Sequence, residues 1–257
     1  MKPQSVAIVT GASQGIGRAT AVRLARDFSA IVLAARNEQA LQVTAAAVSS
    51  EGAEPLVCAV DLHEPQAAEA VVNRTLERFG RIDALLNIAG AVPQIDLFEM
   101  TDAQWDDGMA LKLHGARRLT IRAWEALKAS RGSVVLISGS AALDPKPGFA
   151  AVAAVNAAII ALAKAFAEQG IKDGVQVNSV VPGAVMTGRR ESFFKKWAPA
   201  HNMTVEDALR KFPEEVGIAR FGKPEEIAEL MAFLVSPAAK WMTGASVRMD
   251  GGEVKGI

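Results

Sequence analysis

Residues 5–17 read SVAIVTGASQGIG, and this segment carries the strongest signal for the fold of the chain. Its first part, residues 5–10, is a short apolar and β-branched run, which is typical of a strand buried on both faces of a parallel sheet. A glycine-rich turn follows, and residues 16–27 then show a helical pattern. A strand, a glycine turn and a helix in this order predict the opening of a βαβ series.

The same alternation of short apolar runs and helical patterns continues outward to residue 249. Further strands are expected at residues 30–34, 55–60, 83–87, 133–138, 175–180 and 245–249. Further helices are expected at residues 38–50, 65–79, 102–129, 148–169 and 224–235. The pattern predicts an α/β fold, a doubly wound parallel sheet with helices on both faces, as one Rossmann domain over residues 1–257.

Composition narrows the class of function. The 257 residues carry 28 basic and 28 acidic side chains, and zero net charge argues against binding to nucleic acid. Cys58 is the single cysteine, which fits a reducing cytoplasm, and no signal peptide is expected before the first strand. The apolar stretch 149–166 is interrupted by Asn156 and Lys164, so a buried helix is expected there and no membrane span. The three histidines are scattered, and no metal site is expected.

The glycine turn has the chemistry of a dinucleotide site. Gly11 permits a tight exit from the strand, Gly15 leaves room for a ligand, and Gly17 lets the helix pack closely on the sheet. The helix N-terminus offers free N–H groups to a pyrophosphate. We therefore expect a nicotinamide dinucleotide here, bound by Gly11, Ser13, Gln14, Gly15, Ile16 and Gly17.

Arg36 follows the second predicted strand, where an acidic residue would bind the ribose 2′-hydroxyl of NAD. An arginine suits a 2′-phosphate instead, so the sequence favours NADP(H) over NAD(H). The alternative is that Arg36 is a solvated surface residue with no role in cofactor binding.

These motifs resemble the short-chain dehydrogenase/reductase family over almost the whole chain. The matching segments, in order, are Thr10–Gly17 (TGxxxGxG), Asp61-Leu62, Asn87–Gly90 (like NNAG), Asn178, Pro182–Thr187 (PGxxxT), Arg220–Ala228 and Thr243–Gly252. The resemblance implies further cofactor-binding residues, namely Asp61, Leu62, Asn87, Ala89, Gly90, Pro182, Gly183, Val185 and Thr187. Ordinary structural roles remain open: Asn87 can tie strands together, Asp61 can cap a turn, and Gly183 can supply a positive φ.

The resemblance also implies a catalytic tyrosine, a lysine four residues later, a serine and an asparagine, which together protonate the substrate oxygen beside hydride transfer. This chain has Val152 at the tyrosine position, Asn156 at the lysine position, Gly139 at the serine position and Lys112 at the asparagine position. No tyrosine occurs anywhere in the chain, so no other phenol can take over the role.

Two hypotheses follow from the changes at these four positions. In one, the chain is an oxidoreductase of small carbonyl or alcohol compounds, in which Lys112, Asn156 and either Ser138 or Ser140 form an unusual acid–base site. In that hypothesis the alternative for Lys112 is a lysine that extends to solvent from the flank of its helix. In the other, the chain is an inactive dinucleotide-binding pseudoenzyme, acting as a cofactor sensor or a non-catalytic subunit.

Two regions point to partners. The insertion at residues 188–212 resembles the family's substrate-covering lid, and an ordinary amphipathic helix is the alternative. The alanine-rich helix, with the long helix before it, resembles the surfaces through which family members form tetramers, which implies a homo-oligomer.

Overall fold

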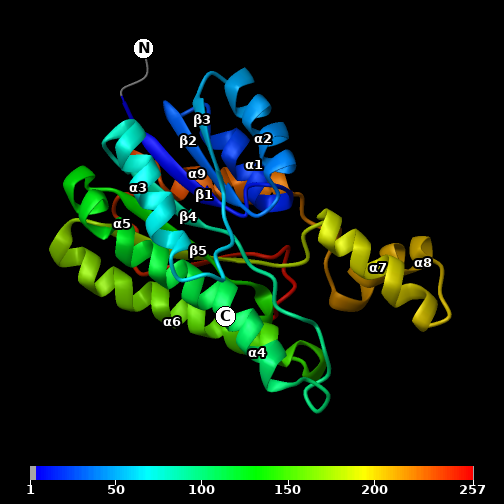
Figure 1. The fold of residues 1–257 in the computed structure, drawn as a ribbon. Helices are drawn as coiled ribbons and strands as arrows, with labels where there is room; N and C mark the ends of the chain where they lie inside the picture. The colour runs from blue at the N-terminus through cyan, green and yellow to red at the C-terminus, as the bar shows by residue number, and fades with distance from the viewer. Residues whose placement is uncertain (1–3, 257) are drawn as a thin grey trace.

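Seven parallel strands form one sheet in the computed structural model, which describes residues 4–256 (Figure 1). The strands lie in the order β3-β2-β1-β4-β5-β6-β7. Their bounds are β1 Val6–Thr10, β2 Ala30–Ala35, β3 Glu54–Ala59, β4 Ala84–Asn87, β5 Ser133–Ile137, β6 Gln176–Pro182 and β7 Ser246–Met249. This arrangement confirms the predicted doubly wound α/β fold.

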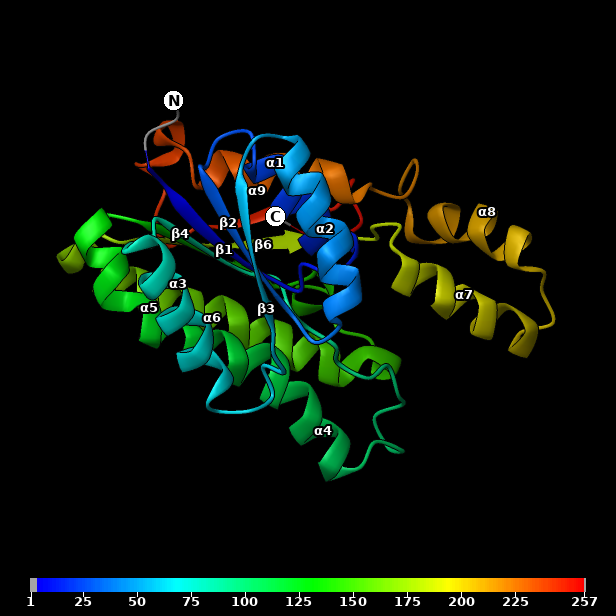
Figure 2. The same ribbon diagram turned by 45° about the horizontal axis from the view of Figure 1, so that its top comes forward.

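Helices cover both faces of the sheet (Figure 2). One face carries α1 (Gly15–Leu24), α2 (Glu38–Ser50) and α9 (Pro224–Leu234), and the other carries α3 (Ala67–Phe79), α5 (Ala116–Ser130) and α6 (Ala150–Asp173). Strand β1 shows why its sequence is apolar throughout. Ala7 and Val9 belong to the core under α1 and α9, whereas Val6 and Ile8 belong to the core under α5 and α6.

The strand order reverses between β1 and β4, which lie side by side although β2 and β3 separate them in sequence. Thr10, the last residue of β1, joins the two strand ends. Its hydroxyl accepts hydrogen bonds from the backbone N–H groups of Ile88 and Ala89, at 2.8 and 2.9 Å. A reversal of this kind leaves a crevice at the carboxyl ends of the strands, where doubly wound proteins bind their ligands.

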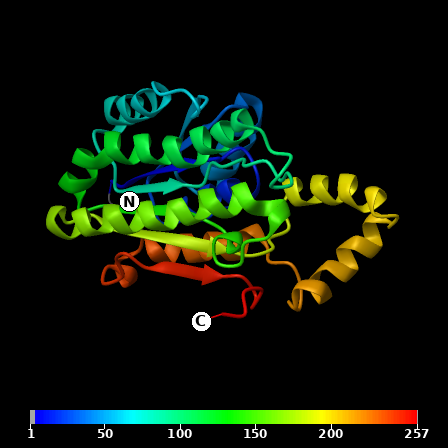
Figure 3. The same ribbon diagram turned by 90° about the horizontal axis from the view of Figure 1, so that it is seen from below.

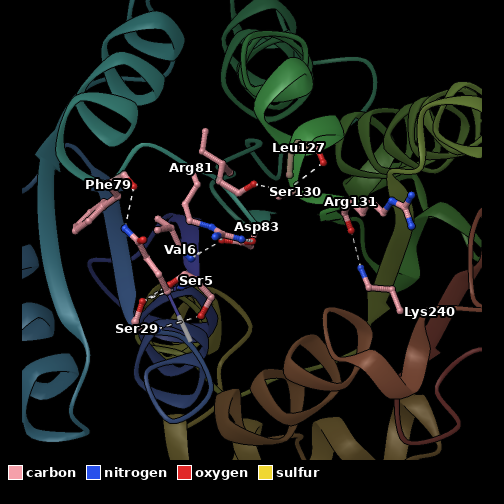
Figure 4. A network of polar contacts seen from close by, with 12 residues as sticks. Ser5, Val6, Ser29, Phe79, Arg81, Asp83, Leu127, Ser130, Arg131 and Lys240 are labelled. Atoms are coloured by element: carbon pink, nitrogen blue, oxygen red, sulfur yellow. Dashed lines mark hydrogen bonds and ion pairs between the residues drawn. The ribbon is translucent and has the colours of Figure 1, made fainter. Parts of the chain in front are cut away.

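Polar contacts join the amino-terminal ends of the strands, opposite the carboxyl ends (Figure 4). Asp83 accepts a hydrogen bond from the backbone N–H of Val6 at 2.8 Å and pairs with Arg81. The Lys240 ammonium donates to the carbonyl oxygen of Arg131 and to the hydroxyl of Ser133, both at 3.0 Å. Lys240 is thus a lysine held in the fold far from the carboxyl edge.

The long helix predicted at residues 102–129 is interrupted. It consists of α4 (Asp102–Met109), a π-helical segment (Ala110–Gly115) and α5. π-Helical turns are rare and often occur at functional sites, because the additional residue in the turn changes the direction of the side chains. The apolar periodicity of the sequence does not reveal this change of pitch.

Helix α6 differs from the buried helix that the sequence predicts. The segment Pro147–Asp173 is long and apolar enough to span a membrane by length and composition, and 33% of its most apolar stretch is buried in the chain. One face packs on the sheet through Ile159, Ala163 and Ala167, and the opposite face is exposed. The predicted burial of this helix therefore holds for one face only.

The insertion after β6 forms two helices, α7 (Gly188–Ala200) and α8 (Val205–Val216), whereas the sequence pattern left open a single amphipathic helix. Figure 3 shows the pair extending away from the sheet beyond its carboxyl edge. The two helices enclose a small apolar core of their own, centred on the fully buried Phe194 with Ala198 and Ala208.

Candidate active site

A cleft of about 550 Å³ lies at the carboxyl ends of the strands. All but three of the predicted site residues line it, and the three outside its wall are Asn87, Ser140 and Asn156. The predicted residues in the wall are Gly11, Ser13, Gln14, Gly15, Ile16, Gly17, Arg36, Asp61, Leu62, Ala89, Gly90, Lys112, Ser138, Pro182, Gly183, Val185 and Thr187. Gln94, Arg189, Arg190 and Phe193 also line the cleft. The last three belong to the insertion at residues 188–212, whose mix of basic and aromatic side chains indicates an apolar or anionic ligand, whereas nothing in the sequence singled out Gln94.

The glycine turn forms the floor at one end of the cleft. Gly11 and Gly15 have positive φ angles of 66° and 54°, which glycine adopts without strain. A Cβ atom on Gly17 would lie 2.2 Å from the carbonyl oxygen of Gly11, so only glycine fits there. Helix α1 begins at Gly15, and the side chain of Gln14 does not cap its N–H groups. Free N–H groups at a close backbone approach fit a pyrophosphate.

Two residues implied by the resemblance have packing roles. Asn87 is buried behind the wall and donates from its side-chain nitrogen to the hydroxyl of Thr120 at 3.1 Å, which ties β4 to α5. Gly183 lies in the wall of the cleft and does not have a positive φ, so the alternative that it only supplies a positive φ is wrong. A Cβ on Gly183 would come within 2.7 Å of the Cα of Asp250, so this glycine allows the two segments to approach closely.

Arg36 and Asp61 line the far end of the cleft, beyond the glycine turn. The Arg36 guanidinium is 3.9 Å from the Asp61 carboxylate and its side chain is 65% exposed, so it is accessible to a ligand. Burial would raise the pKa of Asp61, but hydrogen bonds from the His63 ring and backbone outweigh it and hold this pKa low. Asp61 therefore caps its own turn and also presents a charged carboxylate to the cleft.

Lys112 lies at the near end of the cleft, in the π-helical segment. Its ammonium donates hydrogen bonds to the carbonyl oxygen of Ser138 at 3.1 Å and to the side-chain oxygen of Asn156 at 2.5 Å. The side chain thus turns inward, which excludes the solvated lysine that the sequence left open. Burial, assisted by the charge of Arg189, lowers the pKa of Lys112 to about 7.

The positions that the resemblance assigns to catalysis meet around Lys112. Asn156 is buried, and its backbone carbonyl accepts a hydrogen bond from the Ser138 hydroxyl at 2.8 Å. A Cβ on Gly139 would lie 2.7 Å from the side-chain nitrogen of Asn156. Glycine at position 139 therefore provides the space that Asn156 occupies, and Asn156 in turn holds Lys112. Val152 adds an apolar surface to the same part of the wall.

Ser140 points away from the cleft. Its hydroxyl donates to the Glu253 carboxylate at 3.1 Å, and the other oxygen of Glu253 accepts from the backbone N–H of Ala184 at 2.7 Å. Glu253 thus connects the segment after β5 with the segment after β6. Ser138 lines the cleft and Ser140 does not. Of the two serines predicted to orient a substrate, Ser138 is therefore the one that remains a candidate.

The first turn of α7 covers the near end of the cleft. The Arg189 guanidinium donates to the carbonyl oxygens of Gly90 at 3.1 Å and Val92 at 2.8 Å, which joins α7 to the segment after β4. The Arg190 guanidinium lies 5.4 Å from the ring centre of Phe212 in α8. Both arginines line the cleft on the side of Lys112.

A family model described as enoyl-(acyl carrier protein) reductase matches residues 11–253. The chain belongs to the short-chain dehydrogenase/reductase family. It is 31% identical to the short-chain reductase protein NovJ of Streptomyces niveus over 249 residues, covering 97% of this chain and 94% of NovJ. It is 32% identical to a 3-oxoacyl-[acyl-carrier-protein] reductase of Synechocystis sp. over 252 residues, covering 97% of this chain and 96% of the relative.

Solved structures of short-chain dehydrogenases/reductases have the same fold. L-sorbose reductase from Gluconobacter frateurii, complexed with NADPH and L-sorbose, matches with a TM-score of 0.94 and 29% identity, and the match covers all of both chains. A variant of actinorhodin polyketide ketoreductase with NADPH matches with a TM-score of 0.91 and 28% identity, over 98% of each chain. The similarity extends through the glycine turn and through α7 and α8, and it supports a nicotinamide dinucleotide as the cofactor of this fold.

Proposed function

We propose that this chain is an NADP(H)-dependent reductase of small carbonyl compounds in which Lys112 donates the proton. The observation that carries the proposal is the inward-turned Lys112 ammonium in the wall of the cleft. An ammonium has three N–H donors, and the carbonyl of Ser138 and the side chain of Asn156 accept from two of them. The third N–H is left for the oxygen of a substrate.

The near end of the cleft supplies what carbonyl reduction needs from the protein. The dinucleotide, when bound, supplies the hydride that reduces the carbonyl carbon. The carbonyl oxygen then gains negative charge and needs a proton, and a donor with a pKa near neutrality gives it most efficiently. Lys112 has such a pKa, about 7, and Ser138 lies beside it in the wall. Asn156 acts as the residue that positions the ammonium.

Turnover of a panel of ketones, aldehydes and keto acids with NADPH tests this proposal. Lys112→Met should lower kcat/KM about 100-fold or more, because a positioned general acid contributes at least that factor. Lys240→Met is the matched control, since the Lys240 ammonium also donates two hydrogen bonds, but at the opposite ends of the strands. Thermal unfolding and NADPH affinity of both variants separate loss of chemistry from loss of fold. Equal turnover in the Lys112→Met variant and the wild type would remove Lys112 from the mechanism.

A second candidate function is a dinucleotide-binding pseudoenzyme. Val152 favours it, because this apolar residue in the cleft wall has no proton to give and the chain contains no tyrosine. NADPH binding measured by calorimetry, without turnover of any substrate in the panel, supports this candidate over the reductase. Absence of binding by both NADPH and NADH would contradict both candidates.

The cofactor preference belongs to the same proposal. Arg36 is accessible at the end of the cleft beyond the glycine turn and suits a 2′-phosphate, which supports NADP(H) over NAD(H). We further propose that α7 and α8 act as a lid over the cleft. We also propose a homo-oligomer that forms through the exposed face of α6. A cytoplasmic location is in keeping with the single, buried Cys58.

A further inference from the structure

The near end of the cleft has an unbalanced charge. Among the described residues that line the cleft, the charged ones are Arg36, Asp61, Lys112, Arg189 and Arg190. Arg36 and Asp61 face each other at the far end. The charged side chains that line the near end are therefore all cations, and burial lowers the pKa of each of them. A ligand that reaches this end meets positive charge in a partly desolvated space.

Of the two arginines, Arg189 is already engaged, since its guanidinium donates to the carbonyl oxygens of Gly90 and Val92. Arg190 is different. Its backbone N–H bonds to the Thr187 hydroxyl, and its guanidinium packs against the Phe212 ring. Within residues 4–256, this guanidinium makes neither a hydrogen bond nor an ion pair. Its five N–H donors are left for a ligand.

The Glu253 carboxylate does not fill this role. Burial lowers the pKa of Arg190, and the charge of Glu253 only partly offsets this effect. The two oxygens of Glu253 accept hydrogen bonds from Ser140 and from the backbone of Ala184. The charge of Arg189 shows where Arg190 lies, because it acts on both Arg190 and Lys112. Arg190 therefore belongs to the Lys112 end of the cleft.

We propose that Arg190 binds a carboxylate of the substrate, so that the compounds this chain takes are keto acids rather than neutral ketones. The reduction of keto acids rests on the proposed reductase function, whereas the binding of a carboxylate by Arg190 does not. An arginine and a carboxylate form two parallel charge-assisted hydrogen bonds, which fix the orientation of the acid as well as its affinity. A substrate held in this way by Arg190 directs its carbonyl group into the space beside Lys112 and Ser138. The cofactor's pyrophosphate is the other source of anionic oxygens near Thr187.

A binding experiment tests the site without any turnover. Oxamate, an unreactive analogue of a keto acid, and oxamide, its neutral counterpart, are titrated by calorimetry into the protein with and without NADP⁺. We expect oxamate to bind at least about tenfold more tightly than oxamide, because charge-assisted bonds are worth this factor or more. Arg190→Met should abolish the difference. Lys196→Met, which removes a cation from an exposed position of the same helix α7, should keep it.

Kinetics with matched substrates complete the test. Short keto acids should have a kcat/KM at least about tenfold above that of their primary amides in the wild type, and this ratio should approach one in Arg190→Met. Equal rates for acids and amides, or equal binding of oxamate and oxamide, would overturn the inference while leaving the reductase proposal intact. Oxamate binding that depends on Arg190 without turnover would sustain the inference and refute the reductase. A weaker NADPH affinity in Arg190→Met, with the oxamate preference unchanged, would assign Arg190 to the pyrophosphate and overturn the proposal.

Discussion

Lys112 is the residue that we propose as the proton donor, and its protonation predicts the pH profile. Its pKa is lowered to about 7, and only the protonated form can give a proton to a carbonyl oxygen. Carbonyl reduction should therefore be constant at acidic pH and fall as the pH rises through about 7. Alcohol oxidation, which needs the neutral amine as a base, should rise over the same range. Initial rates in both directions against pH measure this.

A variant separates Lys112 from other titrating groups. Lys112→Arg keeps the positive charge but does not lose its proton in the accessible pH range. The descending limb near neutrality should disappear in this variant, together with most of the activity. A limb that persists unchanged would assign the titration to another group.

Arg36 carries the predicted choice of cofactor. Arg36→Ala should weaken NADPH about tenfold or more and leave NADH affinity unchanged, because only the 2′-phosphate meets the guanidinium. Arg26→Ala is a suitable control, since Arg26 pairs with Glu51 outside the cleft. An equal loss of affinity for both dinucleotides would show that Arg36 does not read the 2′-phosphate.

The turn between β1 and α1 is the element most sensitive to added volume. Gly17→Ala places a Cβ against the carbonyl oxygen of Gly11, which is main chain and cannot rotate away. The variant should lose about 1–3 kcal/mol of stability, as overpacked sites do. NADPH affinity should fall with it, because the helix N-terminus moves.

Urea unfolding and calorimetric titration of NADPH check this prediction. Gly148→Ala serves as the control, because a Cβ at Gly148 has no neighbour within 4 Å. Full stability and full cofactor affinity in Gly17→Ala would mean that the turn tolerates displacement.

The sequence predicts well those helices, strands and turns whose pattern depends only on residues close together in the chain. The strands and the glycine turn follow from apolar runs and from glycine spacing, which depend on neighbouring residues. The contacts that make the site depend on residues far apart in the chain. Ser140 and Glu253, for example, are 113 positions apart, and no local pattern links them. The π-helical turn that directs Lys112 inward and the orientation of Arg190 belong to the same class.

At the scale of the whole molecule, the exposed apolar face of α6 predicts self-association. Its small side chains recur at Ala154, Ala157, Ala161 and Ala165, which all lie on the exposed side of the helix. Ala161→Arg should reduce the molar mass measured by light scattering after size exclusion, because a buried, unpaired charge opposes an apolar interface.

The matched control introduces the same charge elsewhere. Ala46→Arg lies on an exposed position of α2, on the other face of the sheet, and should leave the molar mass unchanged. A wild-type protein that is monomeric at micromolar concentration would contradict the proposed homo-oligomer outright.

The hydrogen bonds between α7 and the segment after β4 depend on the identity of a residue on one side only. Arg189 supplies a side chain, whereas Gly90 and Val92 supply only main-chain oxygens, which every amino acid carries. Substitution at position 92 therefore cannot remove the acceptor, and substitution at position 189 removes both bonds at once. Among descendants of this gene, a change at the single codon for Arg189 is therefore enough to lose both bonds.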